Sequence, residues 1–283
     1  MKKQLILLIL IGMTTISVKA QSNSPLFSEN VGDYKVYLLS EGQQKGNTGI
    51  LIGATPEMIA EQIPEGTFPN ASNAFLIQTP DKNILVDTGF GRLLFDNLES
   101  IGLDAKQIDV VLITHMHGDH IGGLLKDGQI AFPNADLYIA QPEHDYWVNQ
   151  NNAGAINVIN AYKKQLNLFE PNELENIITP LLPGITPVAA YGHTPGHTVF
   201  LVESNEDKLL IWGDLTHAMA IQMPYPQVAV TYDVNPEEAV QSREVILKYV
   251  AENKIPIAGM HIAYPAVGEI KKICGKGYEF IPR

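Results

Sequence analysis

The segment HMHGDH places three histidines and one aspartate within six residues: His115, His117, Asp119 and His120. The whole chain of 283 residues has only eight histidines, so a chance cluster of this kind is not expected. The segment follows Asp109–Thr114, whose apolar and β-branched residues predict a short buried strand. Just past a strand the backbone is irregular, so the first two histidines can bind one metal ion while the aspartate and the last histidine bind a neighbouring one. Imidazole and carboxylate ligands suit Zn²⁺ and similar first-row ions.

Four side chains do not complete two metal sites, and further candidate ligands occur downstream. His193 lies in GHTPGH between two strand-like segments, Asp214 ends the segment IWGD, and His261 ends GMH. We expect His193 to complete the first site, His261 to complete the second, and Asp214 to bridge both. Each residue alone is weak evidence, but all three share a position at the end of a predicted buried strand.

The elements that must position these ligands are short strands spread along the whole chain. Predicted strands are Tyr34–Ser40, Asn73–Thr79, Asn83–Asp87, Asp109–Thr114, Asp136–Ala140, Ile185–Ala189, Thr198–Glu203, Lys208–Trp212 and, as the last one, Ile255–Ala258. Predicted helices are Arg92–Ile101, Pro142–Gln150, Ala153–Leu166 and one that starts at the cap Asn235 and runs to about Glu252. Glu41–Ser72 is expected to be a loop with a short helix around Pro56–Gln62. This pattern predicts one α/β domain, and the early hairpin argues against a purely parallel sheet.

The composition excludes several classes of protein and of binding site. Apolar residues make up 45% of the chain and charged residues 18%, which are ordinary globular values. The formal net charge is −12 and we find no basic patch, so no nucleic-acid partner is expected. Cys274 is the single cysteine, which excludes an intramolecular disulfide and a metal site made of cysteines.

The first twenty residues have the three-part layout of a secretory signal. A basic pair at positions 2 and 3 precedes the apolar run Leu5–Ile11, which is too short to span a bilayer, and Val18-Lys19-Ala20 is a small-x-small cleavage pattern. We therefore expect residues 1–20 to be a signal peptide cleaved near Ala20. The mature protein would be periplasmic or secreted, without a membrane anchor. Loss of three lysines would change the net charge from −12 to −15.

Taken together, HMHGDH, GHTPGH, the strand-end aspartate and the final histidine resemble the metallo-β-lactamase fold. The resemblance covers about Asn73 to the C-terminus. It implies an α/β fold, a four-layer αββα sandwich with mixed sheets, formed by residues 21–283 as a single hydrolase domain. It also implies two divalent ions at one edge of the sheets, Zn²⁺ or alternatively Mn²⁺, Co²⁺ or Fe²⁺. Asp87 matches the family's early acid, which orients the ligands without binding the metal.

Departures from the family pattern discriminate among its branches. β-Lactamases of this fold carry Cys or Ser in place of Asp214, and diiron flavoproteins carry Glu in place of His117. Glyoxalase II is similar in all seven ligands but has a basic C-terminal helical region that we do not find here. RNA-processing members do not suit a net charge of −15. Quorum-quenching lactonases usually carry Tyr where this chain has His217.

The remaining branch is the methyl parathion hydrolase-like group of exported hydrolases, which the chain resembles at many scattered positions. These are Thr114-His115-Met116-His117, Asp119-His120, Phe132-Pro133-Asn134-Ala135, Glu143-His144-Asp145 with Trp147, Gly213-Asp214 with His217, Tyr232-Asp233 with Arg243, and His261 with Tyr264-Pro265 and Gly268. The resemblance implies a dinuclear zinc hydrolase whose metal-bridging hydroxide cleaves an ester, lactone or phosphotriester of a small, hydrophobic molecule. The natural substrate stays open.

Two residues are expected to take part in the reaction. Two ions about 3.5–4 Å apart lower the pKa of a bridging water, and Asp119 can orient it and move a proton. His217 either donates to a substrate oxygen or braces Asp214. Four apolar residues are candidates for the substrate pocket, with core packing as the alternative for each: Phe90, Trp147, Met223 and Tyr264.

Other residues and functions are weaker candidates. His197 is expected to close the turn beneath His193, His144 to lie at the surface, and Cys274 to be a structural thiol. A glyoxalase II-like thioesterase and a mononuclear-iron sulfur dioxygenase remain alternative enzymes. A non-catalytic binding protein would have a broken ligand set, and here all seven positions are filled. A homodimer is common for enzymes of this size, but the sequence does not decide it.

Overall fold

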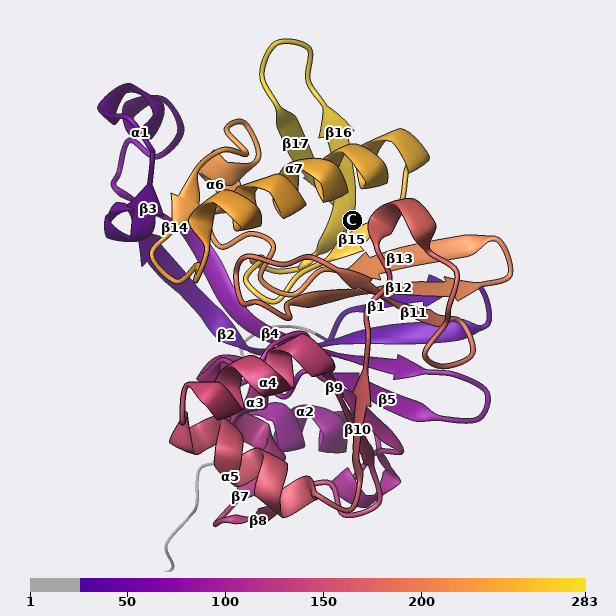
Figure 1. Cartoon of the computed structure of the whole chain (residues 1–283). Helices are drawn as coiled ribbons and strands as arrows, with labels where there is room; N and C mark the ends of the chain where they lie inside the picture. Colours follow the sequence, from indigo (N-terminus) through magenta and orange to yellow (C-terminus); the bar gives the residue numbers. More distant parts are fainter. Residues whose placement is uncertain (1–25) are drawn as a thin grey trace, which may run out of the picture.

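The computed structural model describes residues 26–283, which build two β-sheets packed face to face with helices on both outer sides (Figure 1). Helices α2 (Leu94–Ser100), α4 (Gln141–Asn149) and α5 (Ala153–Tyr162) lie on the side of the first sheet, and α7 (Pro236–Asn253) lies on the side of the second. This is the four-layer αββα sandwich, so the predicted fold class is confirmed. The expected signal peptide, residues 1–20, lies outside the described residues.

The first sheet has seven strands in the order β1-β2-β4-β5-β6-β9-β10, antiparallel at its start and parallel from β5 onward. They are β1 (Ser28–Val31), β2 (Tyr34–Asn47), β4 (Thr67–Gln78), β5 (Asn83–Val86), β6 (Val110–Leu112), β9 (Asp136–Ala140) and β10 (Leu166–Phe169). The second sheet has six strands in the order β11-β12-β13-β15-β16-β17. They are β11 (Ile185–Ala189), β12 (Thr198–Ser204), β13 (Asp207–Ile211), β15 (Ile257–Ala258), β16 (Val267–Lys272) and β17 (Tyr278–Pro282).

Shorter elements connect these layers. Two small ribbons pair β14 (Ala229–Val230) with β3 (Leu51–Ile52) and β7 (Leu125–Lys126) with β8 (Gln129–Ile130). The remaining helices are α1 (Pro56–Gln62), α3 (Gly118–Ile121), α6 (Met219–Gln222) and 3₁₀ turns at Thr48–Ile50, Ala105–Gln107, Gly122–Leu124 and Leu174–Asn176. The predicted short helix at Pro56–Gln62 is confirmed, with Thr55 as its cap and Pro56 at its first position.

Strand residues of the first sheet alternate between two hydrophobic cores, as the period of two in a β-strand requires. Ile84 and Val86 of β5 belong to a core shared with the second sheet and with Ile246 of α7. Leu85 points the other way and packs with Leu94 of α2. Burial on both faces explains why these strands are short runs of Val, Ile and Leu.

The expectation that Glu41–Ser72 is mainly loop is wrong. β2 continues to Asn47 and β4 begins at Thr67, and the two strands pair along their whole length up to Asn47↔Thr67. Cross-strand hydrogen bonds stabilise these polar segments, whereas local strand propensity does not favour them.

Two further boundaries differ from the predictions. The helix predicted over Ala153–Leu166 ends at Tyr162, and residues from Leu166 form β10 at the edge of the first sheet. Ile255–Ala258 is not the last strand, because β16 and β17 follow as an antiparallel pair. Three of the six residues of β16 are buried and the other three are exposed, so the segment lacks the apolar run that marks the inner strands.

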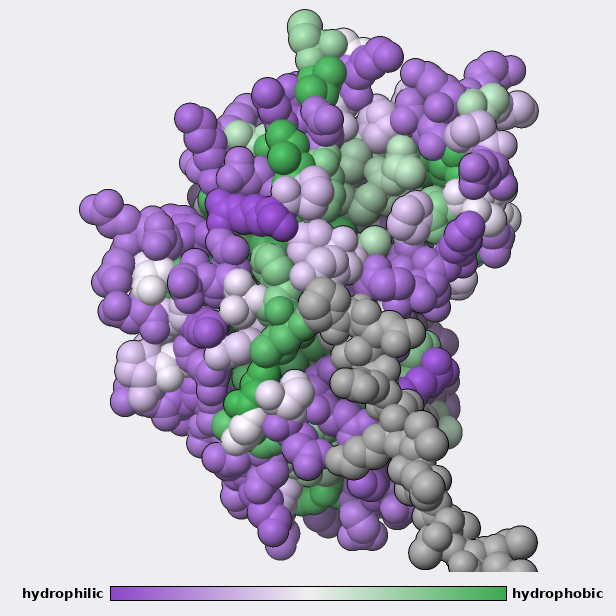
Figure 2. Space-filling model, turned by 180° about the vertical axis from the view of Figure 1, so that it is seen from behind, coloured by the Kyte–Doolittle hydropathy of each residue, from purple (hydrophilic) through white to green (hydrophobic). Residues whose placement is uncertain are grey.

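Seen from the side opposite to Figure 1, the surface is mostly hydrophilic, with hydrophobic residues gathered in a strip along the middle (Figure 2). Within residues 26–283, no helix combines the length and the apolarity that crossing a bilayer requires.

Candidate metal centre

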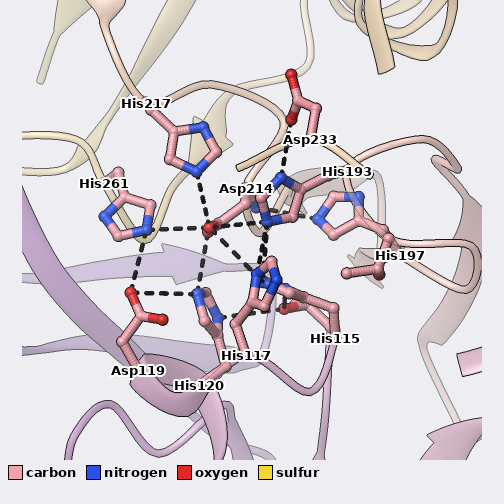
Figure 3. A network of polar contacts seen from close by, with 12 residues as sticks. His115, His117, Asp119, His120, His193, His197, Asp214, His217, Asp233 and His261 are labelled. Carbon is pink, nitrogen blue, oxygen red and sulfur yellow. Dashed lines mark hydrogen bonds and ion pairs between the residues drawn. The ribbon is translucent and has the colours of Figure 1, made fainter. Parts of the chain in front are cut away.

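The seven predicted ligands meet at one end of the sandwich, carried by loops that follow strands of both sheets (Figure 3). The HMHGDH segment follows β6 of the first sheet and continues into α3. His193 lies between β11 and β12, Asp214 follows β13, and His261 follows β15, all in the second sheet. The two sheets therefore each contribute part of the ligand set.

Three imidazole nitrogens converge at the first position. His117 Nδ1 lies 3.0 Å from both His115 Nε2 and His193 Nε2, and the last two atoms are 3.1 Å apart. In a tetrahedral zinc site with Zn–N bonds of 2.0–2.1 Å, neighbouring nitrogens are about 3.3 Å apart, so the cluster has nearly this size. Burial lowers the pKa of His115 and His193 well below the usual value, so their rings are neutral and keep a lone pair for a metal ion.

The second position consists of Asp119, His120 and His261. Asp214 lies between the two positions: its Oδ2 is 3.4 Å from His193 Nε2 and 3.0 Å from His261 Nε2, and its Oδ1 is 3.2 Å from His120 Nε2. His120 Nε2 and Asp214 Oδ1 are buried, and neither has a hydrogen-bond partner among the described residues. Buried polar atoms are costly without a partner, so this set of imidazole and carboxylate donors fits a divalent metal ion, which Asp214 would help to hold.

Hydrogen bonds to the other ring nitrogens fix how the ligands point. His120 Nδ1 lies 2.7 Å from Asp87 Oδ2, His193 Nδ1 lies 2.9 Å from Asp233 Oδ1, and His261 Nδ1 lies 2.9 Å from the Ala71 carbonyl. Contacts of this kind hold a ligating histidine in one tautomer and orientation. Asp233 was not singled out by the sequence for this role, because no spacing relates it to His193.

His197 supports Asp214 and does not belong to the candidate metal-binding groups. Its Nδ1 donates to the Ala190 carbonyl and its Nε2 accepts the Asp214 backbone N–H, at 2.9 and 3.0 Å. Burial lowers the pKa of His197 to about 4, so the ring stays neutral, as these two partners require. Gly213 has φ +56°, and a Cβ there would lie 2.5 Å from His197 Nε2, so only glycine fits beside this ring.

Comparison with known proteins agrees with this geometry. The Metallo-beta-lactamase superfamily model matches residues 67–254, which is most of the described chain. The chain belongs to the metallo-beta-lactamase superfamily. A curated relative is the atrochrysone carboxyl ACP thioesterase of Passalora fulva, 30% identical over 148 residues, or 50% of this chain. That match spans only 37% of the relative's own length.

Two solved structures share the architecture over more than nine-tenths of this chain. The hydrolase AbOPH superposes with a TM-score of 0.83 at 24% identity, covering 93% of this chain and 99% of that one. AidC, a dizinc quorum-quenching lactonase solved with the product N-hexanoyl-L-homoserine, superposes with a TM-score of 0.82 at 25% identity, covering 91% and 97%.

A pocket of about 600 Å³ opens onto the metal ligands of this superfamily member. It is lined by Gln44, Lys45, Gly46, Asn47, Ile50, Asn70, Phe90, Arg92, His117, Gly118, Asp119, His193, Asp214, His217, Tyr232 and His261. The ends of β2 and β4, which the sequence did not predict as strands, therefore form part of its wall. The wall offers a substrate both apolar surface and the positive charge of Lys45 and Arg92.

The four residues expected to line the pocket are placed differently. Phe90 lines it, and its backbone N–H donates to Glu41, the extra residue of a β-bulge in β2. Met223 is packed in the core, and Trp147 lies behind His117 with its indole N–H bonded to Glu143. Tyr264 is 40% exposed and packs edge-on against Phe27, outside the pocket lining.

His217 borders the pocket and contacts Asp214. Its Nε2 lies 3.0 Å from Asp214 Oδ2, while its Nδ1 is buried without a hydrogen-bond partner among the described residues. His217 therefore contacts Asp214, which it was expected to brace, and also borders the pocket, where donation to a substrate oxygen was the alternative expectation. His144 lies away from the pocket and bonds Asp145, and Cys274 is an exposed free thiol in the turn between β16 and β17.

Proposed function

We propose that the protein is an exported dinuclear metal hydrolase, with Zn²⁺ as the expected metal, that cleaves an ester, lactone or phosphotriester bond in a small molecule. The observation that carries this proposal is the convergence of three histidines at the first position and of Asp119, His120 and His261 at the second, with Asp214 within 3.4 Å of both groups. When bound there, two divalent ions lower the pKa of water toward neutrality and polarise the group under attack.

The chain's own residues supply orientation and proton transfer. Asp119 faces the pocket with 25% of its side chain exposed, so its carboxylate can orient the attacking water and accept its proton. Asp214 fixes the relation of the two ligand groups, because its Oδ2 lies 3.4 Å from His193 Nε2 of the first group and 3.0 Å from His261 Nε2 of the second. We infer that His217, which lines the pocket, donates a proton to the oxygen that leaves the substrate. No serine, cysteine or lysine nucleophile is needed for this reaction.

Several observations support this class of substrate. A dizinc lactonase and a hydrolase named AbOPH share the fold over more than nine-tenths of this chain. The methyl parathion hydrolase-like subgroup, suggested by the scattered sequence matches, is part of the same proposal. Because curated relatives include a thioesterase, thioester cleavage is the second candidate activity.

A panel of lactones, aryl esters, phosphotriesters, thioesters and β-lactams tests the proposal. We expect kcat/KM to be highest for a lactone, an ester or a phosphotriester. A thioester that exceeds them all would favour the second candidate. Iron-dependent O₂ uptake by a protein that binds a single ion, without hydrolysis of the panel, would instead indicate a sulfur dioxygenase and contradict the proposal.

Replacing His217 by alanine is expected to lower kcat about 100-fold while both metal ions stay bound, because a donor to the leaving oxygen is lost. His217→Gln keeps a side-chain donor and should recover part of the rate. The measurements are steady-state kinetics on the best substrate and metal analysis of each variant. Loss of an ion from His217→Ala, with kcat per bound ion pair unchanged, would show that His217 only braces Asp214.

Export is part of the proposal and can be tested separately. When the full chain is expressed in a bacterial host with a secretory pathway, the mature protein should begin at Gln21, because Val18-Lys19-Ala20 is a cleavage pattern. Mass spectrometry of the purified protein gives its N-terminus. An active protein that retains Met1 and stays in the cytoplasm would contradict export.

A further inference from the structure

Glu143 is a buried carboxylate that the proposed mechanism does not use. It lies near the start of α4, and the residue is only 1% exposed. Its Oε1 accepts the Met116 backbone N–H at 2.7 Å and the Trp147 indole N–H at 2.5 Å. Its Oε2 accepts the Thr194 hydroxyl at 2.6 Å and the Gly196 backbone N–H at 3.0 Å. Burial raises the pKa of Glu143, and these four donors oppose that rise.

Three of the four donors belong to the two loops that form the first metal position. Met116 stands between His115 and His117 in the chain, and Thr194 directly follows His193. These two loops follow strands of different sheets, and His115 and His193 are 78 residues apart in the sequence. A single carboxylate on α4 therefore ties together the backbones that carry all three histidines of this position.

Close packing holds the loop that follows His193 against the start of α4. A Cβ on Gly196 would lie 2.2 Å from the Glu143 backbone nitrogen, so the loop rests directly on the start of α4. A buried carboxylate with four donors is strongly held, since charge-assisted hydrogen bonds are about twice as strong as neutral ones. Small shifts of one loop against the other are thereby resisted.

The second metal position depends on other contacts. His120 is oriented by Asp87 and His261 by the Ala71 carbonyl. The loop on both sides of His261 is held by Asn73, whose amide donates to the Gly259 and Ile262 carbonyls. None of the hydrogen bonds found for Glu143 in the described chain reaches these residues. Thr114 donates to Asp87 and also contacts His115 Nδ1, so the two positions share this pair as well as Asp214. The hydrogen bonds of Glu143 support the first position alone.

We propose that Glu143 is a positioning residue that selectively sets the affinity of the first metal position, the one formed by His115, His117 and His193. This inference rests on the proposed function, because it requires that both positions bind an ion. Contacts of this outer kind typically change metal affinity 10- to 100-fold when removed.

The test measures metal affinity in purified full-length protein by competition with a chromophoric chelator, using Zn²⁺ alone. Glu143→Gln should weaken one of the two affinities about 10- to 100-fold and leave the other within about threefold. In a His261→Ala background, which weakens binding at the second position, Glu143→Gln should lower the affinity for the remaining ion by the same factor. In a His193→Ala background, Glu143→Gln should leave the affinity for the remaining ion unchanged.

A matched control separates positioning from general loss of stability. Tyr162→Phe removes two buried hydrogen bonds, from the Phe132 N–H and to the Leu124 carbonyl, in the same half of the protein but away from the ligand loops. It should lower the Tm and leave both affinities unchanged. Two unchanged affinities in Glu143→Gln, or equal weakening in both histidine backgrounds, would overturn the positioning role of Glu143 and leave the proposed function intact. Fewer than two ions in the wild type would overturn both.

Discussion

Replacing Asp214 by alanine is expected to abolish metal binding and hydrolysis together, with kcat/KM falling by about 10³-fold or more. The carboxylate is buried between the two ligand groups, and five histidine nitrogens lie within 3.6 Å of its oxygens. Without its negative charge, nothing at this place would offset the repulsion between two cations held close together. The several kcal/mol by which a metal pair stabilises the transition state would then be lost. Metal analysis after gel filtration and steady-state kinetics on the same preparation measure both effects.

His144→Ala is a suitable control for this experiment, because His144 also is a histidine paired with an aspartate but lies outside the pocket. It should keep two ions and full activity. An Asp214→Ala protein that retains two ions and hydrolyses substrate at the wild-type rate would contradict the bridging role.

Replacing Asp119 by asparagine is expected to lower kcat by about 10²- to 10⁴-fold, which is the usual contribution of a positioned proton acceptor. Asp119 is the most exposed member of the second ligand group, and its Oδ2 lies 3.5 Å from His261 Nε2. Asparagine keeps the size of the side chain and one oxygen for a metal ion, but it cannot take a proton from the attacking water. Weaker binding at the second position is expected as well.

Assaying this variant at saturating Zn²⁺ separates the two effects of the substitution. If the proton is accepted by Asp119, kcat stays low even when both positions are filled. Full recovery of kcat at high Zn²⁺ would show that Asp119 serves only as a ligand.

The buried strands of the two sheets and the candidate metal ligands at their ends could be predicted from the sequence, because both have a local sequence pattern. The ranges predicted for Asp136–Ala140 and Ile185–Ala189 agree with β9 and β11, since buried strands are bounded runs of apolar residues. The seven ligands share one recognisable position, at the ends of such strands. Once two sheets pack face to face, that position brings them to one edge, as the structure shows.

Features that depend on pairing between distant segments could not be predicted. The polar ends of β2 and β4 form strands because they bond each other, and they also supply Gln44, Lys45 and Asn70 to the pocket wall. Met223 has a side chain suited to a pocket or a core, and only the packing decides that it lies in the core. Apolar character alone does not distinguish these two environments.

Apart from Asp87, which the family resemblance indicated, the supports of the ligands were hidden in the sequence. Glu143 and Asp233 contact loops that are 51 and 40 residues away along the chain. The sequence shows both acids but no spacing that pairs them with their partners. A general rule, that a ligating histidine is held by an outer acceptor, would have indicated that such residues exist without identifying them.

The most direct test of the central claim is a titration of metal-free protein with Zn²⁺ while hydrolysis of the best substrate is followed. The chelated protein should be inactive, and activity should rise with added Zn²⁺ and reach its maximum at two equivalents, because both ligand groups must be filled. Mn²⁺ or Co²⁺ should restore activity in the same way. Full hydrolysis by protein shown to contain no metal, or a maximum at one equivalent, would contradict a dinuclear metal hydrolase.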